Sequence, residues 1–403
     1  MTSFEIEYLT EEPRLIELCS LYWEFNEAIG FLNKPSKLAA RFGFSTRDVS
    51  RVVAQNCVVR STEEKCVRCG ISRTFSSQTD YLQRRSWQTR SWVCSDCERA
   101  AREEARQEYY REQERQRAAD LARMEHLRRV IKESFKLIET DPIDLASLSL
   151  ESAVYLLSFV RLGANEDFTH IIPAQLFTEP LAPTADYKYE IIRQLDREGL
   201  ITVHPDSPLE AFIFKDERIH YYLDKVIWAL PFGREPQQKK QVIIDLEAIF
   251  KNKEWPKNWH QEWMPLWKKI ALHECFEYLA IALSEHDFAF KPGDKTRLVF
   301  SNLLEDYSVA QAYNLIWQGT KDAASFYVRQ QVTRQHAANY AINSIQRRAE
   351  RGRAEGWDFK PFRRNPKYAP QSVVSAIFFN TVLQIGEAGF NTPVKLGEHQ
   401  EEI

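Results

Sequence analysis

The sequence predicts a mainly α-helical protein with several domains. Its 403 residues are enough for about two to four domains, and 44% of them are hydrophobic. Apolar residues recur at the three- and four-residue spacing of helices through much of the chain. Residues 98–140 contain neither glycine nor proline, which favours one long helix there. We expect β-structure only in short stretches, at 58–97 and near 200–214.

Changes in composition divide the chain into five segments. We expect a helical unit at 1–57, a small cysteine-containing unit at 58–97, a long charged helix at 98–140, a mixed unit at 141–235 and a helical domain at 236–403. The net charge of −3 is close to neutral, so any surface that binds nucleic acid must be a local patch. No P-loop, Rossmann or nucleophile-elbow motif occurs.

Residues 35–53 predict two short helices joined by a tight turn. Gly43 supplies the permissive backbone that the turn needs, and Ser45 can cap the second helix. The expected buried positions are Leu38, Ala39 and Phe42 on the first helix, and Val49 and Val52 on the second.

This pattern resembles the helix-turn-helix class of DNA-binding units, in which the second helix enters the major groove. The resemblance implies that exposed residues near the start of the second helix contact nucleic acid. These residues are Thr46, Arg47, Ser50 and Arg51. The alternative is an ordinary helical hairpin whose two arginines are only solvated.

Two cysteine pairs follow, Cys66 with Cys69 and Cys94 with Cys97. Four thiolates in two CxxC pairs form the ligand set of a structural Zn²⁺ site, which has no open position for chemistry. The segment resembles the zinc-ribbon class, so we expect short strands at 73–77 and 90–93. A pair of disulfides, or a redox CxxC, is the alternative.

The cysteine-containing unit is locally basic. Between residues 65 and 94, six basic side chains face one acidic one, and aromatic residues lie among them. Basic groups hold phosphates, and aromatic rings can stack on bases, although at least one tryptophan here is expected in the small core. The predicted phosphate contacts are Arg73, Arg84, Arg85 and Arg90.

The helix predicted at 98–140 would extend over roughly 60 Å. Its first half alternates charge sign on all faces, which is typical of a solvated spacer. Its second half is more amphipathic, so we expect it to dock on the C-terminal part of the chain or on a second copy of the protein.

Residues 149–230 resemble a winged-helix unit. Helices at 151–162 and 187–199 precede a strand at 200–204, a proline-containing turn and a returning strand at 211–214. Acidic residues on the second helix disfavour DNA contact, so we expect a structural or protein-binding role here.

The C-terminal domain is predicted to be helical. Four tryptophans between residues 255 and 267 recur at every fourth position, which is typical of a core stripe, and Pro256 and Pro265 are expected to break that helix. A long helix is predicted from Val309 to Arg353, and a last one from Gln371 to Ile385.

Two sites for chemistry are conceivable in this domain. Arg329 and His336 resemble the spaced Arg and His of some helical ribonuclease domains in prokaryotic toxins and defence systems, where His is the acid and base and Arg steadies the phosphate. His273 and Glu277 have the spacing of helical metal ligands but lack the second His of a zinc-protease motif. A partly buried structural His is the alternative for His273.

The segment from residue 329 to 367 is strongly basic, with ten Lys or Arg residues against three acidic residues. Phosphate contact is the functional interpretation, and the predicted contacts are Arg347, Arg348, Arg363 and Arg364. The alternative is an arginine-rich segment whose side chains pair with acidic residues elsewhere in the fold.

The seven cysteines show no disulfide framework, the N-terminus lacks a signal-peptide pattern, and no apolar run approaches a membrane span. We therefore expect a cytoplasmic protein.

Three functions fit the sequence. The first is a non-enzymatic, zinc-containing protein of regulatory, mobile-element or defence type that binds duplex DNA. The second is a nucleic-acid-cleaving toxin or antiviral effector that uses Arg329 and His336. The third is a protein-binding scaffold.

Overall fold

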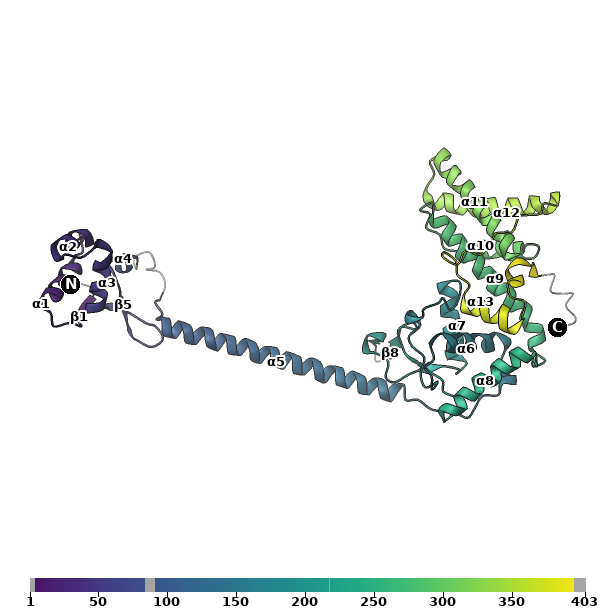
Figure 1. The fold of residues 1–403 in the computed structure, drawn as a ribbon, viewed down its shortest axis with the longest axis horizontal. Helices are drawn as coiled ribbons and strands as arrows, with labels where there is room; N and C mark the ends of the chain where they lie inside the picture. The colour runs from purple at the N-terminus through teal and green to yellow at the C-terminus, as the bar shows by residue number, and fades with distance from the viewer. Residues whose placement is uncertain (1–3, 84–90, 217, 395–403) are drawn as a thin grey trace. The chain divides into compact units, whose positions relative to one another are not determined.

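The computed structural model describes residues 4–83, 91–216 and 218–394, and divides the chain into two compact units, Met1–Ala122 and Arg123–Ile403 (Figure 1). The described part is mainly helical with small antiparallel sheets, which confirms the predicted class in outline. One helix, α5, crosses the division between the units.

The first unit combines short helices with a three-stranded sheet. Its elements are β1 (Phe4–Tyr8), α1 (Pro13–Tyr22), β2 (Phe25–Asn26), β3 (Gly30–Phe31), α2 (Pro35–Phe42), α3 (Thr46–Asn56), β4 (Cys57–Lys65), β5 (Ser72–Phe75), α4 (Gln78–Gln83) and the start of α5 (Ser95–Ser134). The sheet has the order β1-β4-β5 and is antiparallel. Since β1 pairs with β4 from Phe4 opposite Ser61 to Tyr8 opposite Cys57, the expected division at residue 57 falls inside this sheet.

The helix pair α2 and α3 forms where the sequence predicts it. Gly43 ends α2 at a φ of 72°, in the left-handed region that glycine adopts without strain. The Ser45 hydroxyl accepts a 3.2 Å hydrogen bond from the backbone N–H of Asp48 and so caps α3. Val49 and Val53 are buried, whereas the predicted Val52 is only half-buried. The core of the unit therefore lies under α1, α2 and α3.

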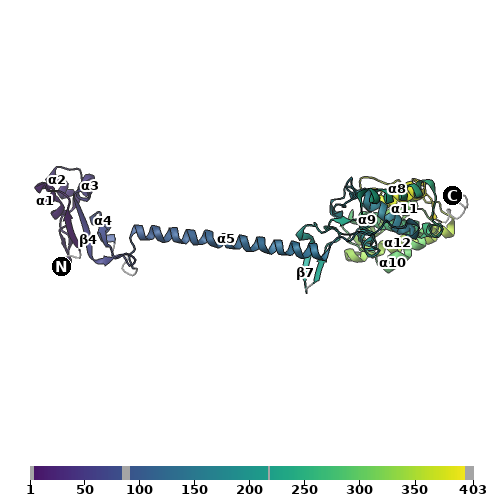
Figure 2. The ribbon, with the colours of Figure 1, turned by 90° about the horizontal axis from the view of Figure 1, so that it is seen from below.

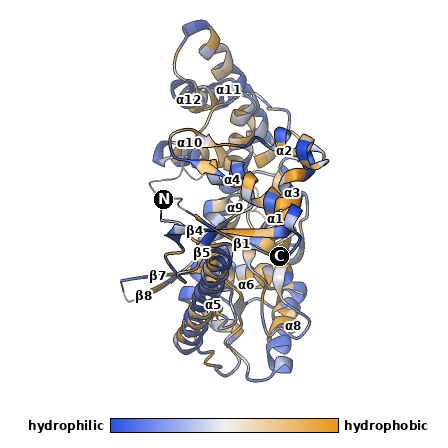
Figure 3. Ribbon diagram, turned by 90° about the vertical axis from the view of Figure 1, so that its left-hand side faces the viewer, coloured by the Kyte–Doolittle hydropathy of each residue, from blue (hydrophilic) through white to orange (hydrophobic). Residues whose placement is uncertain are grey.

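Helix α5 is stabilised mainly by its own side chains. Five Arg–carboxylate pairs link positions three or four residues apart on its exposed surface. Figure 3 shows the hydrophilic colour along most of this helix. Only Ile131 is buried, and Phe135, just beyond the helix, packs against the core of the second unit. Within this chain, contact with the second unit's core is thus made by the C-terminal end of α5, while Leu121 and Met124 are exposed.

The second unit is mostly helical and has one large core. Its elements are η2 (Leu145–Ser147), α6 (Leu150–Gly163), η3 (Ala174–Leu176), α7 (Ala185–Arg197), β6 (Thr202–Val203), η4 (Leu209–Ala211), β7 (Phe212–Lys215), β8 (Arg218–Tyr221), β9 (Trp228–Ala229), α8 (Pro236–Asn252), α9 (Trp259–Ser284), α10 (Asp294–Leu304), α11 (Val309–Gln330), α12 (Arg334–Glu355), α13 (Val373–Ala376), the π-helix η5 (Ile377–Val382) and α14 (Ala388–Asn391).

The hairpin predicted after α7 is wrong in its pairing. Strand β6 pairs with β9, with Val203 opposite Trp228, whereas β7 pairs with β8 in a separate hairpin (Figure 2). Ser207 lies in the segment between β6 and β7. Its hydroxyl donates to the backbone oxygen of His204 at 2.7 Å and accepts from the N–H of Ile227 at 2.9 Å. These bonds join the turn after β6 to Ile227, the residue before β9.

The predicted break at Pro265 and the predicted single helix from Val309 to Arg353 are also wrong. Pro265 lies inside α9, which continues through it. The flanking Trp259 and Trp267 are buried in the core, so packing offsets the backbone hydrogen bond that proline cannot donate. The helix predicted from Val309 to Arg353 is two helices, because Gln331 adopts a φ of 50° and the Thr333 hydroxyl caps α12.

Candidate metal centre and nucleic-acid contacts

The four cysteines of the two CxxC pairs come together in the first unit. The Sγ atoms of Cys66, Cys69, Cys94 and Cys97 all lie within 4.8 Å of one another. No other group of three or more His, Cys, Asp or Glu side chains in the described ranges has this proximity. All seven cysteines are free thiols, so the disulfide alternative is not supported. The cluster could hold a metal ion, as the sequence predicts.

The backbone shapes this cluster. The first pair lies in the turn between β4 and β5, where Gly70 has a φ of 77° and donates its N–H to the Cys66 oxygen at 2.8 Å. The second pair lies at the start of α5, where the Cys94 N–H donates to the Cys66 sulfur at 3.3 Å. This N–H is the main cause of the lowering of the pKa of Cys66 to about 6, whereas the side-chain hydrogen bonds with Cys94 and Cys69 raise the pKa of Cys97.

The expected second ribbon strand is absent. Residues 91–93 have no regular structure, and Arg90 lies outside the described residues. Trp92 instead accepts, through its backbone oxygen, a 3.1 Å hydrogen bond from the N–H of Val67. The second cysteine pair is therefore presented by an irregular segment and a helix end, not by a β-ribbon.

The four predicted nucleic-acid contacts on α3 differ in how exposed they are and in whether they already have a partner within the protein. Thr46 and Arg47 are exposed, and no described side chain pairs with Arg47. Arg51 is exposed but pairs with Asp48 at 2.6 Å. Ser50 is half-buried, and its hydroxyl shares a 2.9 Å hydrogen bond with Tyr22. Arg47 is thus the basic side chain of this set that is free to meet a phosphate.

One of the four predicted phosphate contacts of the cysteine unit is already paired, and the other three lie outside the described residues. Arg73 is bound to Glu64 at 3.0 Å, with its guanidinium 5.3 Å from the ring centre of Phe75. It therefore stabilises the β4–β5 hairpin. Arg84, Arg85 and Arg90 lie outside the described residues.

Arg329 and His336 do not share a helix. Arg329 is at the end of α11, and His336 is in the first turn of α12, across the turn at Gln331. Both side chains are exposed, and the Arg329 Nε donates back to the oxygen of Ser325 at 3.3 Å. The open pocket of about 630 Å³ beside Arg329 is not lined by His336. The predicted catalytic histidine and phosphate-steadying arginine therefore lie on different helices, on either side of a short turn.

The four arginines predicted from the basic C-terminal segment have different roles. Arg347 and Arg363 are exposed. Arg348 makes a two-pronged pair with Asp322, at 2.9 and 3.0 Å, and also donates to Gln318. Arg364 is buried against Glu274. Arg348 and Arg364 thus follow the alternative in which arginines pair with acids elsewhere in the fold.

The Arg364–Glu274 ion pair lies in the core of the second unit. The Arg364 Nη2 and Glu274 Oε1 atoms are 2.8 Å apart, and the two side chains are 8% and 0% exposed. The Ser375 hydroxyl donates to the same carboxylate oxygen at 2.8 Å. The one sign of this pair in the sequence is a glutamate among the apolar residues of α9.

Glu277, one turn after Glu274, is predicted to make stability depend on pH. Burial raises the pKa of Glu277 to about 8, and the Glu274 carboxylate adds to this effect. An unfolded glutamate has a pKa of about 4.3, so the folded state binds the proton more tightly. The stabilisation is therefore complete below about pH 4 and is lost as the pH rises toward 8.

Urea denaturation at about pH 5 and about pH 8 measures this effect. We expect Glu277 to contribute a fall of a few kcal/mol to the wild-type free energy of unfolding, since one pKa unit corresponds to about 1.4 kcal/mol, while the lowered pKa of His273 acts in the opposite direction in wild type and variants alike. The Glu277→Gln variant should lose most of this fall, whereas Glu285→Gln, at the exposed end of α9, should keep it. An equal fall in wild type and Glu277→Gln would contradict the prediction.

His273 does not act with Glu277 as a ligand pair. The His273 Nδ1 lies 2.8 Å from the Thr184 hydroxyl, and its ring stacks on Tyr187 with centres 4.4 Å apart. Burial lowers the pKa of His273 to about 4, so it is neutral at physiological pH. This is the structural histidine of the alternative interpretation.

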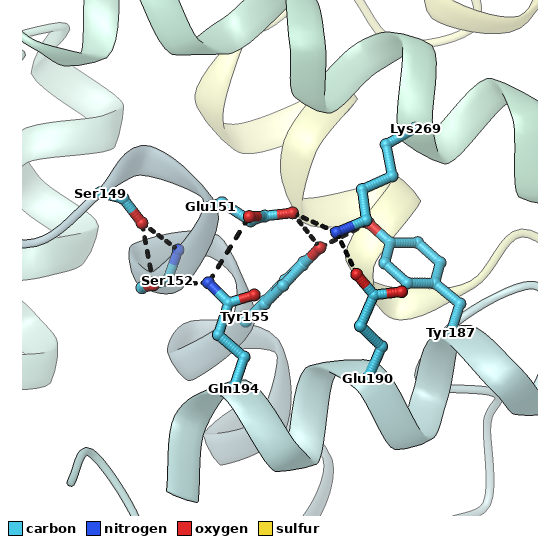
Figure 4. A network of polar contacts seen from close by, with 8 residues as sticks. All are labelled: Ser149, Glu151, Ser152, Tyr155, Tyr187, Glu190, Gln194 and Lys269. Atoms are coloured by element: carbon cyan, nitrogen blue, oxygen red, sulfur yellow. Dashed lines mark hydrogen bonds and ion pairs between the residues drawn. The ribbon is translucent and has the colours of Figure 1, made fainter. Parts of the chain in front are cut away.

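A polar network beside His273 joins α6, α7 and α9 (Figure 4). The Lys269 ammonium lies 2.6 Å from the carboxylates of both Glu151 and Glu190. The Tyr155 hydroxyl lies 2.6 Å from Glu151 and 2.9 Å from the Tyr187 hydroxyl. Because each of these groups has a partner, the network is typical of a structural clamp.

No described helix combines the length and the apolar composition needed to cross a membrane. No protein-family model, curated protein or solved structure matches the chain.

Proposed function

We propose that the first unit is a zinc-stabilised module that binds duplex DNA through α3 and the β4–β5 hairpin. The observation that carries this proposal is the placement of the four-cysteine cluster at the turn of a hairpin that directly follows a capped helix pair. A cluster of four thiolates fits tetrahedral Zn²⁺, which would hold shape without an open position. In this proposal Cys66, Cys69, Cys94 and Cys97 are the ligands.

The arrangement of the unit supports the nucleic-acid partner. Three helices are followed by the β4–β5 hairpin, and β1 completes the sheet, which resembles a winged-helix unit. In such a unit α3 enters a groove while the hairpin lies along the backbone. Thr46 and Arg47 are exposed at the start of α3, where base edges and phosphates are contacted.

The test compares Arg47→Ala with the wild-type protein. Fluorescence anisotropy with duplex DNA over a range of salt concentrations is expected to show salt-sensitive binding by the zinc-loaded, full-length protein. Arg47→Ala should bind more weakly and lower the salt slope by about 1. Arg106→Ala, an exposed and ion-paired arginine on α5, is the matched control and should bind as wild type. Equal affinity and slope in Arg47→Ala would exclude α3 as the contact.

The same samples on a denaturing gel test the alternative activity. Intact strands agree with a binding protein. Shortened strands that disappear in His336→Ala would instead assign nuclease activity to the second unit. Absence of any binding at physiological salt would favour the scaffold.

A further inference from the structure

A strap at residues 357–364 follows α12 and crosses the surface of the second unit. It directs some side chains inward and others outward. Phe359 is 7% exposed, and its ring packs directly against Gly352. A Cβ atom at position 352 would lie only 2.5 Å from this ring, so the close packing requires glycine there. Arg364 points inward to Glu274. Trp357, Lys360 and Arg363 are exposed.

The strap is fixed along its length. The Phe362 N–H donates to the oxygen of Ala310 at 2.9 Å, and the Asn314 side chain donates to the oxygen of Lys360 at 2.8 Å. The buried Arg364–Glu274 pair fixes its end. The outward side chains are therefore presented by a rigid backbone, which lowers the entropy cost of binding a partner.

Exposed aromatic and basic side chains lie on the strap and on the two helices that adjoin it, α11 and α12. Trp317 and Trp357 are 38% and 39% exposed, and the Trp317 ring centre lies 5.9 Å from that of Phe362 on the strap. Lys321 lies over Trp317 at 3.4 Å, and Arg351 lies 5.2 Å from the ring of Trp357. We call this set the strap surface: Trp317, Lys321, Arg351, Trp357, Lys360 and Arg363.

Three of the four cations on the strap surface have no ion-pair partner among the described residues, although the strap also carries the exposed Asp358, which accepts a hydrogen bond from Gln311 at 3.4 Å. Arg351 pairs with Glu355 at 2.7 Å. Within the described ranges, no acidic side chain pairs with Lys321, Lys360 or Arg363. Two large indoles are thus left partly in water, together with three cations that have no acidic partner. This combination indicates a partner that is both anionic and aromatic.

We propose that the strap surface binds single-stranded nucleic acid. Phosphates would meet Lys321, Lys360 and Arg363, and unpaired bases would stack on Trp317 and Trp357. A duplex hides its base faces within the stack, so exposed indoles favour a single strand. This inference deepens the proposed function, because it gives the second unit a nucleic-acid contact of its own.

The test uses the full-length, zinc-loaded protein and a short fluorescein-labelled oligothymidylate. The Trp317→Ala/Trp357→Ala variant is expected to bind it at least about tenfold more weakly. Lys360→Gln/Arg363→Gln should lower the salt slope by about 1.4, since each phosphate contact on a single strand contributes about 0.7. Tyr110→Ala, an exposed aromatic on α5, is the control and should bind as wild type.

Duplex binding distinguishes this inference from the proposed function. The strap variants should keep duplex affinity, whereas Arg47→Ala should lose duplex affinity and keep oligothymidylate affinity. Thermal unfolding of each variant verifies the fold, and the glutamine variant, which alters only exposed side chains, remains informative if the tryptophan variant unfolds. Unchanged oligothymidylate binding in both strap variants would overturn the inference, as would equally effective competition by polyglutamate.

Discussion

Metal removal by a chelator is expected to unfold the turn between β4 and β5 together with the first turn of α5. A structural zinc site in a small peptide contributes about 10–16 kcal/mol at pH 7. Helices α1 to α3 should remain folded, because their core is made by a separate set of apolar side chains. Hydrogen exchange of the Cys66, Val67 and Gly70 amides, which are hydrogen-bonded at 2.8–3.1 Å, measures the loss.

The Cys69→Ser variant is the matched mutation for this experiment. Cys69 is exposed, so the change removes one of the four proposed metal ligands with little loss of packing. In the variant, the amide hydrogens of the same three residues should exchange rapidly even in excess zinc, while the amides of the β1–β4 ladder stay protected. Equal protection with and without chelator would show that the cluster needs no metal.

The Arg364→Met variant is expected to lower the free energy of unfolding of the second unit by about 3–5 kcal/mol, since breaking a buried ion pair leaves an uncompensated charge. The exposed fraction of the Glu274 side chain is 0%, so its carboxylate has no access to water when Arg364 is removed. Chemical denaturation followed by circular dichroism measures the change.

Two variants control for other causes. Arg161→Met removes an arginine from a half-exposed pair with Glu247 and should cost at most about 1 kcal/mol. The double variant Glu274→Gln/Arg364→Met should be more stable than the sum of its single changes predicts. Additive effects of the two substitutions would show that the pair is not coupled.

Local signals made the helix pair of the first unit predictable. Gly43, Ser45 and the apolar positions of α2 each specify a turn, a cap or a buried face within a few residues. The end of α11 had a weaker signal, because Gln331 adopts a left-handed conformation without being Gly or Asn. Only Thr333, a possible N-cap, marked the start of α12.

The sequence could not predict which arginines of the basic segment are structural, because their acidic partners lie far away in the chain. Arg364 and Glu274 are 90 residues apart in the chain, and Arg348 and Asp322 are 26 apart. A basic segment therefore looks uniform in sequence, although some of its arginines are structural and others face solvent. The cysteine cluster was predictable because its spacing alone specifies the chemistry.

The cysteine cluster also closes a loop. Cys69 and Cys94 are 25 residues apart in sequence and adjacent in space, with sulfurs 3.6 Å apart. A permanent link across such a loop removes chain entropy worth about 3.5 kcal/mol from the unfolded state. Each doubling of loop length changes this entropy by only about 0.6 kcal/mol, so the contribution depends weakly on the number of residues between the two cysteines. A metal at this position would therefore join the β4–β5 turn to the start of α5, two parts of the chain that are distant in sequence, and would do so mainly by restricting the unfolded state.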